Sequence, residues 1–169
     1  MSINEIIKNT ALKYLGKKEK ENNSGFADAS FETKMKSVGW LKGQSWCSYF
    51  VELVWLEAMP SDATLIKKYC SGSVVTTFKN FKASAEFKVQ QLPVVGAIVA
   101  WEKGKSGLGH IGIVVQVNAD GSFKHISGNT NSDGSREGVE VAFKVSRTGK
   151  PFSSSGMNLL GFISPIKIK

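Results

Sequence analysis

Apolar residues in the first half of the chain recur every three or four positions. This spacing is typical of helices that bury one face. Ser2 followed by Glu5 is a capping box that marks the start of the first helix, and Pro60 marks the end of the third. The pattern predicts helices over residues 3–15, 31–38, 47–59 and 76–87.

The chain changes character after Pro93, where β-branched and other apolar residues form short runs separated by Gly, Asn and Asp. Such runs indicate strands. We predict them over residues 94–101, 110–117, 122–126, 139–146 and 159–163. Helices followed by strands predict an α+β fold, in which N-terminal helices pack on a C-terminal antiparallel sheet.

Length and composition fit one globular domain that spans residues 1–169. Hydrophobic residues make up 41% of the chain and charged residues 21%, which is near the globular average. No apolar run approaches the length of a membrane span, and the first residues lack the apolar centre of a secretory signal. We therefore expect synthesis in the cytoplasm without a signal peptide, and no membrane insertion.

The formal net charge is +8, which favours an anionic partner such as nucleic acid, a bacterial wall or a membrane surface. The lysines are scattered rather than gathered in a stripe, and no nucleic-acid-binding motif is present, so a nucleic-acid partner is not expected. Two cysteines make no disulfide framework in a chain of 169 residues, and four-ligand zinc spacing is absent. We expect no metal and no other cofactor.

Cys47 is the first candidate for chemistry, because it stands where a loop-like stretch ends and a helical pattern begins. A helix N-terminus favours the thiolate form of a cysteine, and the thiolate is the nucleophile of covalent hydrolysis. The backbone N–H of Cys47 is a candidate oxyanion donor, and the side chain of Gln44 is a second one.

His110 opens a predicted strand that a hairpin connects to the next one. If Val117 pairs with Ser122 across the turn, His110 lies opposite Asn129, and the two side chains share a face. A tighter turn would place Asn131 opposite His110 instead.

The first of these registers also pairs Ile113 with Ile126, two apolar residues. An amide oxygen beside His110 would fix the tautomer and the ring plane of the imidazole. Cys47, His110 and Asn129 then supply the nucleophile, the base and the orienting group of a catalytic triad. The other histidine, His125, is expected to be packed rather than catalytic.

Three blocks of sequence resemble the CHAP family of cysteine- and histidine-dependent amidohydrolases and peptidases. They are WCSYFV at 46–51, PVVGAIVAW at 93–101 followed by GHIGIV at 109–114, and ISGNTN at 126–131. The resemblance implies a papain-like fold and cleavage of amide bonds in bacterial peptidoglycan.

The chain departs from the family pattern at two positions. Ser127 stands where many members carry Glu, so Asn129 alone is expected to hold His110, with Ser127 as an auxiliary group acting through a water. Ala97 stands where the family often has Asp, and we interpret that position as structural. Trp46, Trp101 and Asn131 are candidates for a substrate groove, and core packing is the alternative for the tryptophans.

The leading hypothesis is therefore a peptidoglycan hydrolase that acts as a monomer in the cell wall or periplasm after release or secretion. It would cut the muramoyl–L-alanine amide or a peptide bond in the stem or crossbridge. A phage-type lysin (endolysin) would need a holin, whereas an exported antibacterial toxin would need a secretion system and an immunity protein. The alternative is a catalytically weak or inactive wall-binding or interaction protein of the same fold.

Overall fold

The computed structural model describes residues 1–130 and 138–168. Helices come first and strands second, as predicted, and the fold is α+β. The helices are α1 (Ile3–Leu12), α2 (Ala29–Ser37), α3 (Cys47–Ala58), α4 (Ala63–Tyr69) and α5 (Val74–Ser84), with short 3₁₀ turns at Glu21–Asn23 and Pro60–Asp62. The strands are β1 (Phe87–Gln90), β2 (Ile98–Lys103), β3 (Gly109–Val117), β4 (Ser122–Thr130), β5 (Glu140–Arg147) and β6 (Met157–Lys167).

The helix starts follow their sequence signals. The Ser2 hydroxyl accepts a hydrogen bond from the Glu5 N–H at 3.3 Å and caps α1. The prediction of a helix over 76–87 was wrong at its end, because Ala85 adopts a left-handed conformation with φ 55° and Phe87 begins β1. The left-handed residue terminates α5 in the way that a glycine usually does.

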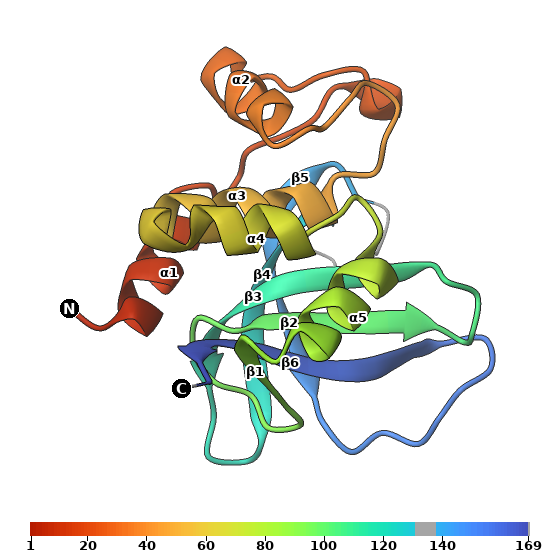
Figure 1. Ribbon diagram of the computed structural model, residues 1–169. Coiled ribbons are helices and arrows are strands. Elements are labelled where there is room, and N and C mark those ends of the chain that lie inside the picture. The colour runs from red at the N-terminus through yellow and green to blue at the C-terminus, as the bar shows by residue number, and fades with distance from the viewer. Residues whose placement is uncertain (131–137, 169) are drawn as a thin grey trace.

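The strands form one sheet in the order β1-β6-β2-β3-β4-β5, and each pair of neighbours is antiparallel. The last strand of the chain therefore lies between two earlier ones. The sheet is strongly twisted, so that β4 and β5 run steeply across the direction of β2 and β6 (Figure 1). In the part of the chain that the structure describes, no helix combines the length and the apolar character needed to cross a membrane.

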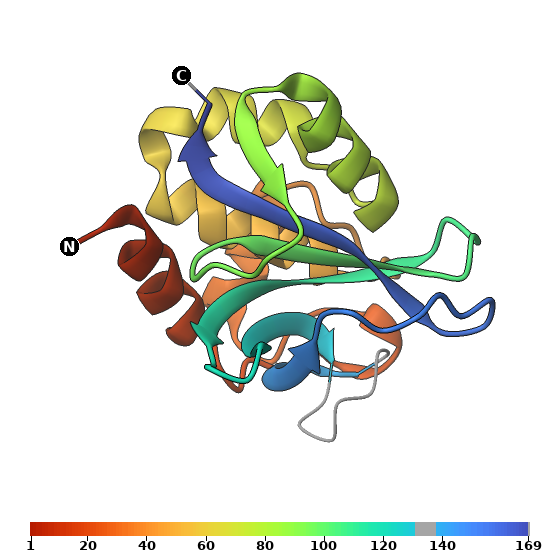
Figure 2. The same cartoon turned by 90° about the horizontal axis from the view of Figure 1, so that it is seen from below.

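The helices gather on one side of the sheet (Figures 1 and 2), and α2 lies outside α3 (Figure 1). The main core fills the space between helices and sheet, with Trp55 and Phe50 of α3 fully buried in it. The other side of the sheet carries a second, smaller core, made of Ala97, Val99, Trp101, Val114, Phe123 and Phe162. Because neighbouring strand residues point to opposite faces, β2, β3, β4 and β6 each contribute to both cores.

The β3–β4 hairpin confirms the predicted pairing of Ile113 with Ile126. The predicted pairing of Val117 with Ser122 was wrong, since Val117 lies opposite Phe123. A bulge between Val114 and Gln116 shifts the register by one residue near the turn. The bulge keeps the deeper residues in the register that buries their apolar side chains.

Candidate active site

Cys47 is the first residue of α3, and its side chain is buried, with 7% of the residue exposed. Trp46 occupies the N-cap position, and no side chain caps the helix there. The first N–H groups of a helix have no partner within the helix, and together with the helix dipole they favour negative charge. The position therefore suits both a thiolate and the oxyanion that forms when a thiolate attacks a carbonyl.

The start of α3 is fixed from two sides. The Ser48 hydroxyl donates to the Ser71 carbonyl at 2.5 Å, which ties the helix to the segment before α5. The Trp46 indole N–H donates to a carboxylate oxygen of Glu19 at 2.8 Å, and burial raises the pKa of that carboxyl although this bond opposes the rise. Trp46 is fully buried and packs its ring edge-on against Phe26. The Trp46 ring therefore belongs to the core and does not line a substrate groove.

The first turn of α3 rests directly on β4 at Gly128. A Cβ atom at this glycine would lie 2.5 Å from the Trp46 ring and 3.0 Å from Cβ of Phe50, so only a glycine fits. The contact brings the helix that starts at Cys47 onto the strand that carries Asn129.

Asn129 is buried and adopts a left-handed backbone conformation with φ 53°. Its carbonyl accepts a hydrogen bond from the Gly138 N–H at 3.1 Å. Asparagine tolerates this conformation better than most residues. The β4–β5 pairing is irregular here, between Ser127 and Thr130, so the left-handed residue marks a local break in the ladder.

His110 is the second residue of β3, is almost fully buried and lies directly opposite Trp101 of β2. The two rings stack, with centroids 6.2 Å apart and planes 25° from parallel. Opposed residues share a face of a sheet, so His110 lies on the side that carries the second core. The closest described β3–β4 pair is Ile113 with Ile126, and the pairing of His110 with Asn129 stays a prediction.

His125 is packed, as expected from the sequence, with Ser127 on one side and Ser146 on the other. Its Nδ1 lies 3.0 Å from the Ser127 hydroxyl and its Nε2 lies 3.2 Å from the Ser146 hydroxyl. Burial first, and then the positive charges of His110 and Lys144, lower the pKa of His125 to about 3. His125 is therefore neutral at neutral pH, and Ser127 is bonded to a neutral ring rather than to a charged group.

Gln44 lies in the loop before α3, where its side-chain oxygen accepts from the Leu41 N–H at 3.0 Å. This bond leaves the amide nitrogen as the group that can donate to an oxyanion. Asn131 lies outside the described residues. Cys47 and Cys70 are not joined by a disulfide.

Sequence reasoning missed a basic cavity of about 150 Å³ that begins at His110. Its lining is Trp101, His110, His125, Lys144, Ser146, Arg147, Lys150 and Met157. The pairing of β4 with β5 places Lys144 opposite His125. A loop separates the two strands in the sequence, so their register could not be predicted from it. Among the described residues, no three His, Cys, Asp or Glu side chains converge to hold a metal ion.

A cysteine at a helix start, a histidine on one strand and an asparagine on the next strand are the residue types that thiol hydrolases use. The chain belongs to the CHAP domain family, since the family model matches residues 39–129, more than half of its length. The match includes Cys47 and His110 and ends at Asn129. The family comprises amidases and peptidases of peptidoglycan. No curated protein and no solved structure shows significant similarity to this chain.

Proposed function

We propose that this protein hydrolyses an amide bond of peptidoglycan through an acyl-enzyme on Cys47. One observation carries the proposal: the uncapped start of α3, with Cys47 as its first residue, rests on Gly128 beside Asn129. The strand of His110 pairs with that same strand. A nucleophile, a base and an orienting amide thus come from three elements that pack on one another.

In this mechanism the Cys47 thiolate attacks the carbonyl carbon, and N–H groups at the start of α3 stabilise the oxyanion, with the Gln44 amide as a second donor. His110 gives its proton to the leaving amine as the C–N bond breaks. It then takes a proton from water, which attacks the thioester and releases Cys47. Asn129 orients the imidazole, and Ser127 has an auxiliary role.

The scissile bond in this proposal is the muramoyl–L-alanine amide or a peptide bond in the stem or crossbridge. The net charge of +8 suits an anionic wall. The proposed setting is the wall or periplasm, reached either as a phage lysin released through a holin or as a toxin exported with a cognate immunity protein.

The proposal is tested by digesting purified sacculi and identifying the muropeptides by mass spectrometry. We expect the wild type to release new amino groups, and Cys47→Ala and His110→Ala to lower the rate by about 10³-fold or more. Cys70→Ser is the matched control, because burial raises the pKa of the Cys70 thiol and disfavours its thiolate. Undiminished release by Cys47→Ala would rule the mechanism out.

The second candidate is a wall-binding protein that has the fold but little activity. The observation that favours this candidate is Ser127, which stands where many family members carry Glu. Its hydroxyl contacts neutral His125 and supplies no negative charge. Binding of the wild type to sacculi without any release of amino groups would select this candidate.

A further inference from the structure

The cavity at His110 has a composition that suits an anion. It lies on the side of the sheet that carries the second core, and Trp101 belongs to both. Its described lining contains three basic side chains, Lys144, Arg147 and Lys150, and no carboxylate. A second hollow shares four of its lining residues, namely Trp101, Arg147, Lys150 and Met157. His110 lines the cavity, whereas Cys47 and Asn129 do not, so the cavity meets the candidate triad at His110 alone.

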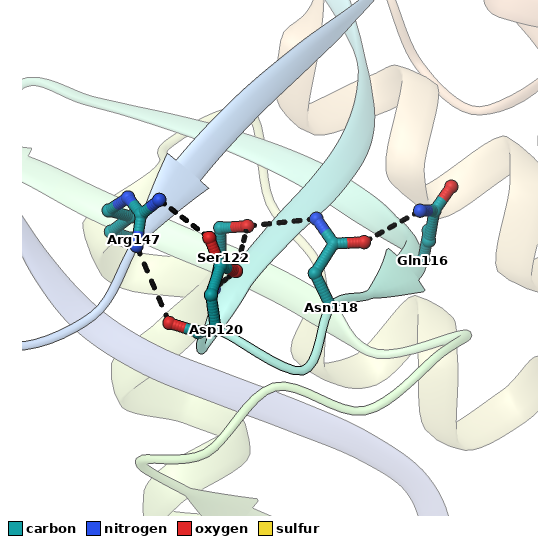
Figure 3. A network of polar contacts seen from close by, with 5 residues as sticks. All are labelled: Gln116, Asn118, Asp120, Ser122 and Arg147. Atoms are coloured by element: carbon teal, nitrogen blue, oxygen red, sulfur yellow. Dashed lines mark hydrogen bonds and ion pairs between the residues drawn. The ribbon is translucent and has the colours of Figure 1, made fainter.

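Arg147 is held at the rim by the β3–β4 hairpin (Figure 3). Its Nη2 donates to Oδ2 of Asp120 at 2.7 Å, and its Nη1 contacts the Asp120 carbonyl at 3.4 Å. The other carboxylate oxygen of Asp120 accepts from the hydroxyl and the N–H of Ser122 at 2.6 and 3.0 Å. The Asn118 amide donates in turn to the Ser122 hydroxyl at 2.8 Å. The guanidinium thus stays oriented although the side chain is exposed.

Asp120 keeps its charge over the working pH range, because hydrogen bonds from Ser122, and then from Arg147, lower its pKa to about 2. Asp120 offsets part of the Arg147 charge, and Lys150 adds a second positive charge to the described lining. A guanidinium carries five N–H donors, and those not bonded to Asp120 can bind a second carboxylate.

We propose that this cavity binds a carboxylate group of the substrate, on the His110 side of the scissile amide. The proposal rests on the proposed function, because His110 would belong to both the catalytic site and the cavity. Wall peptides carry free carboxylates beside their amide bonds. Arg147 and Lys150 would contact such a group, and Trp101 would pack against the carbon chain that bears it.

The first test measures binding alone, with the Cys47→Ala protein so that nothing is cleaved. An acetylated wall-peptide fragment with free carboxylates and the same fragment with carboxamides are titrated, and the Trp101 indole N–H is followed by NMR. We expect the carboxylate form to bind at least about tenfold more tightly. Arg147→Met and Lys150→Met should lose this preference, whereas Lys79→Met, on the exposed side of α5, should keep it. Equal binding of both fragments would overturn the proposal.

The second test measures turnover of the same two peptides. Arg147→Lys keeps the positive charge but loses the planar guanidinium. Asp120→Asn weakens the ion pair that orients Arg147, and Asp120 itself does not line the cavity. Both should raise KM for the carboxylate substrate by about three- to tenfold and leave kcat unchanged. A wild type that cleaves neither peptide contradicts the proposed function, while the binding test still reports on the cavity. Equal kcat/KM for the two peptides would contradict the cavity proposal.

Discussion

At the scale of single residues, Asn129 combines a backbone requirement with a chemical one. Its φ of 53° lies in the left-handed region, where most side chains cost about 1 kcal/mol. Its amide is also the group expected to orient His110. Both requirements select asparagine at this position, and a simple alanine variant would disturb the two together.

Comparing Asn129→Gly with Asn129→Ala separates these two requirements. Glycine accepts the left-handed conformation, so Asn129→Gly should unfold within a few degrees of the wild type, and Asn129→Ala should be less stable by about 1 kcal/mol. Both remove the amide and should lower kcat by about tenfold to a hundredfold. Thermal unfolding and peptide turnover measure the two effects. Full turnover by Asn129→Gly would show that Asn129 does not orient the base.

The sequence identifies single residues only where chemistry and local pattern coincide. Cys47 and His110 are candidates for this reason, and the structure places both at the starts of elements, as predicted. The role of Trp46 could not be settled from the chain, since an aromatic residue beside a nucleophile is equally suited to a groove and to a core. Its burial depends on Phe26 and Glu19, which are more than 15 residues away and whose approach no local pattern encodes.

At the scale of elements, the site depends on how closely α3 approaches β4. Gly128 provides the space for the Trp46 ring, as the distance of 2.5 Å to an added Cβ shows. Overpacking of this kind typically costs about 1–3 kcal/mol. The helix start can relieve the clash only by moving away from the strand that carries Asn129.

We therefore expect Gly128→Ala to lower the free energy of unfolding by about 1–3 kcal/mol and to lower turnover as well. The contact is with the six-membered part of the indole ring, so Trp46→Phe should partly rescue Gly128→Ala. Chemical denaturation of both single variants and the double variant gives the coupling energy. If the two substitutions change the free energy of unfolding additively, the Trp46 ring and residue 128 do not interact.

Elements were predictable from the sequence when they were long enough to show a period. The capped α1 and the long strand β3 satisfy that condition, whereas α4 has 7 residues and β1 has 4, and both were missed. The hairpin shows a different limit. Asn118 to Gly121 indicates the turn, and Gly121 does adopt a positive φ of 79°, but the bulge that absorbs a one-residue shift is set by packing across the sheet.

At the scale of the whole molecule, one buried carboxyl links stability to pH. Glu52 lies on α3 with 7% of the residue exposed. Burial raises its pKa to about 7, and the positive charge of Lys67 only partly opposes this. The folded protein therefore holds a proton that the unfolded chain releases near pH 4.5. Stability should fall as the pH rises from about 4.5 to 7 and stay lower above that range.

Glu52→Gln should remove this dependence. Relative to the wild type, the variant should become more stable by about 2 kcal/mol as the pH rises from 4 to 8, with solvent screening taken into account. Urea unfolding at the two pH values measures the difference, with the exposed Glu21→Gln as charge control. If the wild type and Glu52→Gln show parallel pH profiles, Glu52 is not the group responsible.

The order of the strands in the sheet could not be predicted from the sequence. Short runs of apolar residues predict that strands exist, but β6 pairs with β1 and β2 through residues that lie far apart in the sequence, for example Val99 with Phe162. No turn signal spans such a distance.

That strand order has a consequence for how the protein is made. A ribosome produces β1 and β2 well before residues 157–167, the strand that must insert between them. Until then both edges stay open, which exposes the nascent chain to aggregation and to chaperones. Under the proposed function, the sheet that supports Cys47 and His110 is completed only after residues 157–167 have been made. The strand order thus delays the proposed activity until the ribosome has produced β6.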